Sequence, residues 1–250
     1  MILTIATREL RGLFLSPLAW TLLAMTQGLL AWIFLLLIDE FRSLEGRLVG
    51  LDPTPGVTDL VIAPLLRVAA WALLLLTPLV TMRLFSEERR VGTLDLLLSA
   101  PVTPIEIVLG KYLGVLTFLL GAVALIALMP SSLAAGATLD FGKLGAGLLG
   151  LSLLAASFAA AGLYLSTLTV QPAVAAAATF GLLLAFWIVD MASASQGSVS
   201  PVFHYLSLPR HLDALLQGLI HSTDVAYYLL FSAAFLGLAI RRLGNIQLKG

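Results

Sequence analysis

Histidine and carboxylate side chains that cluster near one end of the sequence are the residues most able to hold a metal ion. The cluster contains His204, His211 and His221, with Asp213 and Asp224 nearby. Zinc is bound by these side-chain types. However, their spacing matches neither HExxH nor another compact ligand set, and Pro209 would break a helix that aligned the first two histidines. We therefore expect no metal site here.

The sequence also lacks the usual signatures of a catalytic centre. A phosphate-binding loop has the pattern GxxxxGK[ST], and the one Gly-Lys pair, Gly110 and Lys111, lacks both the upstream glycine and the following hydroxyl. There is no GxSxG motif, no pair of aspartates within an apolar run and no cysteine. We therefore expect no catalytic residue and no cofactor in this chain, and do not expect it to be an enzyme.

Composition places the chain in a membrane. Hydrophobic residues make up 60% and charged residues only 11%, with a mean hydropathy of +1.03. About 20 apolar residues in a helix cross a hydrocarbon core of about 30 Å. The runs are continuously apolar, which argues against an outer-membrane barrel. We predict an all-α, polytopic membrane protein that forms a single domain over 1–250. Its six predicted spans are Leu18–Ile38, Val61–Phe85, Pro104–Met129, Lys143–Leu168, Pro172–Asp190 and Asp224–Ile240.

Basic residues predict the orientation, because short cytoplasmic loops are enriched in lysine and arginine. An internal amino terminus places nine of the fourteen basic residues inside: Arg8, Arg11, Arg83, Arg89, Arg90, Lys111, Arg241, Arg242 and Lys249. Both termini should then be cytoplasmic, and the segment 191–223 should lie outside as a re-entrant or interfacial segment. The formal net charge of zero gives no reason to expect nucleic acid as a partner.

The first fifteen residues are too short and too polar to span a membrane, but they have the pattern of an amphipathic helix. Their apolar stripe contains Ile2, Ala6, Leu10, Leu13 and Phe14, opposite a polar stripe with Arg8 and Arg11. We predict an interfacial helix over 1–15 that lies on membrane lipid. A signal peptide is the competing interpretation, but no small-residue cleavage pattern follows Ile38.

A charged insert over 86–100 separates the second and third predicted spans. Ser86 to Arg90 should be solvated, and Val91, Leu94, Leu97 and Leu98 should form the apolar face of a short helix that Pro101 ends. Next, Thr103 and Glu106 form a capping box, with proline at the first helical position. Composition alone leaves an ordinary loop and a docking element about equally plausible.

The order of residues in this insert resembles the membrane subunits of type-2 ABC transporters, particularly the permeases similar to the gliding-motility exporter subunit. The resemblance rests on Met82, Arg83, Phe85, Glu87, Glu88, Gly92, Thr93, Leu94, Leu97, Leu98, Pro101, Ile107, Val108, Leu109, Gly110, Lys111 and Tyr112. Weaker similarity extends to Arg8–Pro17 and Gly218–Tyr228.

The resemblance implies that six spans form half of a transporter, that 1–15 is an elbow helix, and that the insert is a coupling helix. The implied partner is a cytoplasmic ATP-binding cassette ATPase, which holds the ATP and magnesium and contacts Glu87, Glu88, Arg89, Gly92, Thr93, Leu94, Asp95 and Leu97. A second copy or a related permease would complete the pathway, and an extracytoplasmic accessory subunit could join it. The implied location is a bacterial cytoplasmic (inner) membrane, and export is the implied direction.

Other possibilities stay open at this point. Gly110 and Gly114 form a GxxxG pattern, and the fourth predicted span is rich in glycine and alanine; a dimer seam and ordinary membrane-helix composition explain these equally well. Few charges fall within the spans, which argues against a proton or cation relay, and the cargo could be amphipathic, lipidic or peptidic. A polytopic membrane enzyme and a membrane scaffold without transport activity are the alternative functions.

Overall fold

The computed structural model describes residues 1–48, 56–94, 102–136, 138–195 and 207–247. Within these ranges the regular structure is helical throughout and contains no strand, which confirms the all-α prediction. The elements are α1 (Ile2–Leu15), α2 (Pro17–Leu48), η1 (Thr58–Ile62), α3 (Ala63–Thr81), α4 (Ser86–Val91), α6 (Pro104–Ser132), η2 (Leu133–Ala135), α7 (Phe141–Leu168), α8 (Pro172–Ser195), α10 (Leu208–Leu216) and α11 (Ser222–Gln247).

Each of the six predicted spans coincides with a helix, and five of these helices are long and apolar enough to cross a membrane. They are Pro17–Leu44, Thr58–Val91, Pro104–Ser132, Phe141–Leu168 and Ser222–Gln247. In α8 the apolar stretch is the shorter Pro172–Ile188. The chain is a multi-pass membrane protein by the length and composition of these helices, and the count of six crossings stays a prediction.

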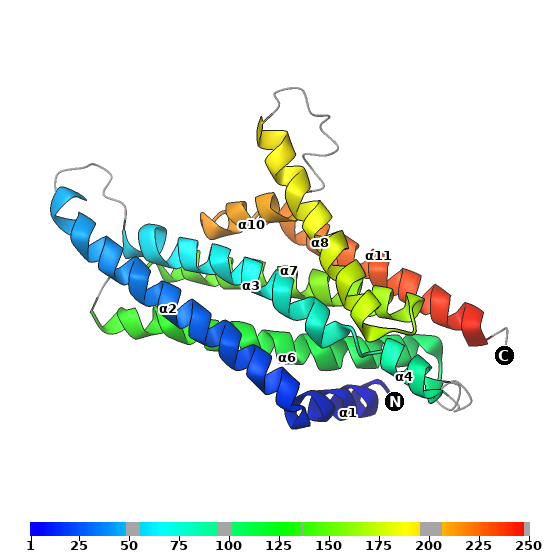
Figure 1. Cartoon of the computed structure of the whole chain (residues 1–250). Helices are drawn as coiled ribbons and strands as arrows, with labels where there is room; N and C mark the ends of the chain where they lie inside the picture. Colours follow the sequence, from blue (N-terminus) through cyan, green and yellow to red (C-terminus); the bar gives the residue numbers. More distant parts are fainter. Residues whose placement is uncertain (49–55, 95–101, 137, 196–206, 248–250) are drawn as a thin grey trace.

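The α7 helix forms the centre of the bundle and packs against α3, α6, α8, α10 and α11 (Figure 1). Its inner faces carry small residues, among them Ala155, Ala159 and Ala160, which are fully or almost fully buried. Small side chains let neighbouring helix backbones approach closely, which is how helices associate where lipid offers no hydrophobic drive. In contrast, α2 shows Trp20, Met25 and other large apolar side chains outward, as expected for a lipid-facing helix.

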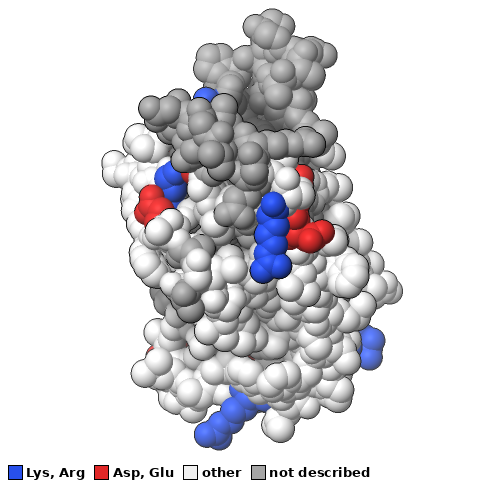
Figure 2. All heavy atoms as spheres, turned by 90° about the vertical axis from the view of Figure 1, so that its left-hand side faces the viewer, with Lys and Arg blue, Asp and Glu red and all other residues white. Residues whose placement is uncertain are grey.

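Two ends of the bundle can be distinguished in Figure 1. We call one the α4 end, because it holds α4, both chain termini and the turn between α7 and α8. We call the other the η1 end, where α2 leads to η1 and α6 leads through η2 to α7. Figure 2 looks onto the η1 end and shows basic and acidic side chains next to each other among mostly uncharged residues. The pairs Arg67–Asp213 (2.6 Å) and Lys143–Asp59 (2.9 Å) account for such contacts.

Helix starts follow local sequence signals. Before α6, the Thr103 side chain accepts a hydrogen bond from the Glu106 N–H, and the Glu106 carboxylate accepts one from the Thr103 N–H, which confirms the predicted capping box. The Asp140 side chain caps α7, and Ser207 caps α10. These caps fix where the helices begin, and therefore which residues lie at each end of the bundle.

The predicted amphipathic helix at the amino terminus is present as α1, and it packs lengthwise along the first half of α6. A Cβ atom added to Gly110 would lie 2.6 Å from the Ile5 Cβ, and one added to Gly114 would lie 2.8 Å from the Glu9 Cβ. The rings of Phe14 and Phe118 meet further along, with their centroids 5.8 Å apart. Gly110 and Gly114 of the GxxxG pattern therefore let α1 of the same chain pack closely on α6. This contact was not predicted from the sequence.

Part of the predicted interfacial segment 191–223 is described. The short helix α10 is amphipathic and packs its apolar face on α7, where Gly150 lies directly beneath Leu212 and Leu215. A glycine at this position leaves room for the two leucine side chains. The residues between Ser195 and Ser207, including His204, lie outside the described ranges.

Candidate functional site

The charged insert contains a short helix, α4, that begins ahead of the predicted apolar face, whose later residues Leu97 and Leu98 lie outside the described residues. It spans Ser86–Val91 and ends at Gly92, whose φ of 76° lies in the left-handed region. The Thr93 N–H then donates to the Glu88 carbonyl (2.9 Å), as in a glycine-terminated helix end. Glycine accepts this conformation because it has no Cβ, so the predicted continuous apolar face from Val91 onward is interrupted at Gly92.

The expectation that Ser86 to Arg90 are all solvated is wrong for the residues that face the bundle. Ser86 is fully buried, and its hydroxyl donates to the Met82 carbonyl. The Arg89 guanidinium donates to the Thr167 carbonyl at the end of α7 (2.7 Å). Because α4 is only six residues long, these inward contacts, rather than helix propensity, hold it in place.

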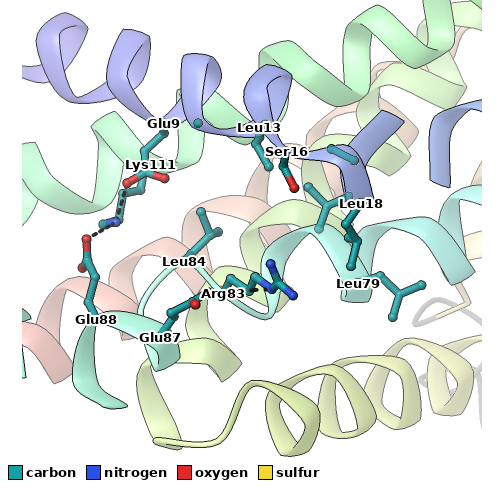
Figure 3. Close-up of a pocket in the computed structure, with 13 residues that line it drawn as sticks. Glu9, Leu13, Ser16, Leu18, Leu79, Arg83, Leu84, Glu87, Glu88 and Lys111 are labelled. Atoms are coloured by element: carbon teal, nitrogen blue, oxygen red, sulfur yellow. Dashed lines mark hydrogen bonds and ion pairs between the residues drawn. The ribbon is translucent and has the colours of Figure 1, made fainter. Parts of the chain in front are cut away.

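An almost completely buried lysine connects α4 to two other helices (Figure 3). The Lys111 ammonium on α6 lies 2.5 Å from a carboxylate oxygen of Glu9 on α1 and 2.8 Å from one of Glu88 on α4. The Lys111 side chain is only 2% exposed, while the two glutamates are about a fifth exposed. We call these three residues the Lys111 cluster.

The Lys111 ammonium also lies close to an aromatic ring. The ammonium lies 5.2 Å from the centroid of the buried Phe85 ring, within the range of a cation–π contact. Two carboxylates face one ammonium, so the cluster carries a formal charge of −1 when all three groups are ionised. One Glu88 oxygen, Oε2, is buried and has no hydrogen-bond partner within the described residues. A buried charge that lost its partner here would be costly, because little water can replace the partner.

Beside the Lys111 cluster lies a cavity of about 290 Å³ between α1, α2, α3 and α4. In Figure 3, Glu9, Lys111 and Glu88 lie together at one edge of the cavity, and Leu18 and Leu79 lie at the other edge, next to Arg83. The Arg83 guanidinium lies 3.7 Å from the carboxylate of Glu87, four residues further along the chain. The lining residues are Glu9, Gly12, Leu13, Ser16, Leu18, Ala19, Leu79, Val80, Arg83, Leu84, Glu87, Glu88 and Lys111.

The outer side of α4 faces away from the bundle. Arg90, Val91, Gly92 and Thr93 are exposed, and Val91 is 65% exposed. A second hollow, of about 520 Å³, separates α4 from the turn between α7 and α8 and is lined in part by Arg90 and Gln171. The outer side of α4 is therefore accessible to a partner protein.

The predicted contact residues divide into three groups. Gly92 and Thr93 are exposed and Glu87 is partly exposed, whereas Glu88 and Arg89 hold α4 to the bundle and Leu94 is buried. Asp95 and Leu97 lie outside the described residues. Sequence reasoning missed the role of Glu9, since nothing local links it to Lys111, which lies 102 residues further along the chain.

The histidine-rich region shows a pair of side chains. His211 Nδ1 lies 2.6 Å from the Asp224 carboxylate, and its ring stacks on Tyr227 with centroids 4.2 Å apart. Among the described residues, no three histidine or acidic side chains come together in a way that could hold a metal ion. The role of His204 stays untested, because that residue is outside the described part.

The chain is thus a multi-pass helical membrane protein with a small charged helix anchored at one end of the bundle. Comparison with protein families matches residues 59–245 to the ABC-2 family transporter proteins. The match covers most of the chain, so the chain belongs to the ABC-2 transporter family and is a membrane component of an ABC transporter. Membership of this family implies an ABC ATPase as partner in general terms. No curated protein sequence matched the chain.

Proposed function

We propose that this chain is the permease subunit of an ATP-driven exporter, with six spans forming half of the transport pathway. The α4 end lies in the cytoplasm of a bacterium, both termini are cytoplasmic, and the bundle crosses the inner membrane. The excess of basic residues in the segments at the α4 end supports this orientation. Family membership favours transport over a membrane enzyme or a scaffold. A permease of the gliding-motility type is the subfamily that the sequence most resembles.

The energy in this proposal comes from a separate ATP-binding cassette ATPase, which holds ATP and magnesium. That subunit docks on α4, the coupling helix, and α1 serves as the elbow helix. We assign the direct contact to Glu87, Gly92 and Thr93, together with the predicted residues Asp95 and Leu97. Glu88 and Arg89, predicted as contact residues, support α4 from within.

One observation carries the proposal. α4 presents an exposed turn, Gly92–Thr93, while partly buried polar contacts fix its other face to the bundle. A surface element that only linked two helices would not need anchors on α6 and α7. An element that receives force from a partner does need such anchors, because otherwise it would move without moving the bundle.

A second permease, either another copy or a related chain, completes the pathway in this proposal. Of the five membrane-length helices, α2 and α11 have the smallest share of buried residues. Both carry large apolar side chains on their outward faces. They are available to lipid or to a second permease. An extracytoplasmic accessory subunit would meet the η1 end, where the structure places exposed charged pairs.

The test is affinity purification of the chain in mild detergent, followed by identification of every associated protein and by an ATP hydrolysis assay. We expect a protein with a phosphate-binding loop in the complex. Thr93→Trp should reduce its yield at least several-fold, because the bulky ring blocks the exposed turn. Thr138→Trp, an exposed threonine at the η1 end, is the matched control and should leave the yield unchanged. A complex without an ATPase, or an equal yield from both variants, would refute the proposal.

A further inference from the structure

The Lys111 cluster joins three helices that are distant in sequence. Lys111 belongs to α6, and its ammonium contacts Glu9 on α1 at 2.5 Å and Glu88 on α4 at 2.8 Å. We propose that Lys111 is a positioning residue that locks α4 to α1 and α6, so that the three elements move as one body when the ATPase acts on α4. This inference depends on the proposed function, since it concerns how α4, the proposed docking element, transmits force from the ATPase to the bundle.

Contacts other than the Lys111 cluster also hold α1 against the first half of α6. The close approach of Ile5 to Gly110 and of Glu9 to Gly114 leaves no room for a side chain between the two helices. The amino group of Met1 lies 3.8 Å from the Glu106 carboxylate near the start of α6. Lys111 directly follows Gly110 in this seam, so a load that reaches its ammonium is shared by both helices.

In contrast, α4 has few attachments of its own. It is six residues long, which is too short for a stable isolated helix. Arg89 ties it to the Thr167 carbonyl of α7, and Glu88 ties it to Lys111. Without the Glu88–Lys111 contact, the polar contacts of α4 among the described residues would be those with α7 and with the preceding residues Met82 and Arg83, and α4 could tilt away from α1 and α6.

Burial makes this contact stiff. If α4 moved away from Lys111, the ammonium would lose one partner at a position that water barely reaches, since the Lys111 side chain is 2% exposed and that of Glu88 is 22% exposed. The Lys143–Asp59 pair at the η1 end differs, because these side chains are 33% and 45% exposed and water can replace either partner. The two pairs therefore provide a test case and a control within one chain.

The experiment measures the distance between spin labels on α1 and α4 in the purified complex with its ATPase. The chain has no cysteine, so Arg8→Cys and Arg90→Cys, both at exposed positions, give a unique label pair. The test variant replaces the whole cluster by uncharged groups of similar size, Glu9→Gln with Glu88→Gln and Lys111→Met, so that no buried charge is left unpaired. The control variant is Asp59→Asn with Lys143→Met.

With the native cluster, we expect one narrow distance distribution that is the same without nucleotide and with ATP and vanadate trapped. In the test variant, the distribution should broaden or shift on trapping, while the melting temperature and the yield of ATPase stay close to native. The control should behave like the native chain. A nucleotide-dependent distance in the native chain, an unchanged narrow distance in the test variant, or equal broadening in the control would overturn the inference. Failure of the ATPase to co-purify with the native chain would instead overturn the proposed function.

Discussion

Asp224 and Asp213 are carboxylates in the part of the chain that follows α8, but their surroundings differ. Asp224 is almost buried and contacts His211 at 2.6 Å, whereas Asp213 is 39% exposed and contacts the exposed Arg67. A buried polar group that loses its partner keeps the full desolvation penalty, whereas an exposed group turns to water. The same substitution should therefore have different effects at the two positions.

We predict that Asp224→Ala lowers the free energy of unfolding by about 1–3 kcal/mol. Asp213→Ala should lower it by at most about 1 kcal/mol. Thermal unfolding of the two variants in the same detergent measures the difference. Equal melting temperatures would show that the His211–Asp224 contact contributes no more than a surface pair.

At the scale of elements, the packing of α1 on α6 depends on two glycines of one helix face. A leucine at Gly110 or Gly114 would overlap Ile5 or Glu9, whereas Gly121 further along α6 has open space around it. Overpacking typically costs about 1–3 kcal/mol. We predict that Gly110→Leu or Gly114→Leu displaces α1 and lowers the melting temperature, and that Gly121→Leu does neither.

Protease sensitivity of the first fifteen residues in detergent gives a direct measure of that displacement. Cleavage within α1 should be faster in Gly110→Leu than in the native chain, and unchanged in Gly121→Leu. If all three proteins were cleaved at the same rate, the α1–α6 contact would not hold α1 in place.

Elements that are determined locally could be predicted from sequence. The capping box of Thr103 and Glu106 was predicted because its residues are three apart, and apolar runs long enough to cross a membrane located the helices. The end of α4 at Gly92 was missed, since apolar spacing alone does not reveal a left-handed glycine. The Glu9–Lys111–Glu88 contacts could not be predicted, because they depend on how α1, α4 and α6 pack rather than on any local pattern.

For the whole molecule, the two ends of the bundle should lie on opposite sides of the membrane. Single cysteines at Arg90, on α4, and at Thr138, at the η1 end, can be labelled from either side because the native chain has no cysteine. We predict that a membrane-impermeant reagent applied to intact cells labels residue 138 and not residue 90. Permeabilised cells should show labelling at both positions, and labelling of residue 90 in intact cells would reverse the proposed orientation.

In the proposed function, an ATPase docks on the exposed turn of α4. The most direct test of this docking places a photo-crosslinking amino acid at Thr93, and at Thr138 for comparison, in native membranes. The proposal predicts that illumination joins residue 93 to a protein with a phosphate-binding loop, and that residue 138 gives no such product. Absence of that product at residue 93, or the same product from both positions, would contradict the proposal.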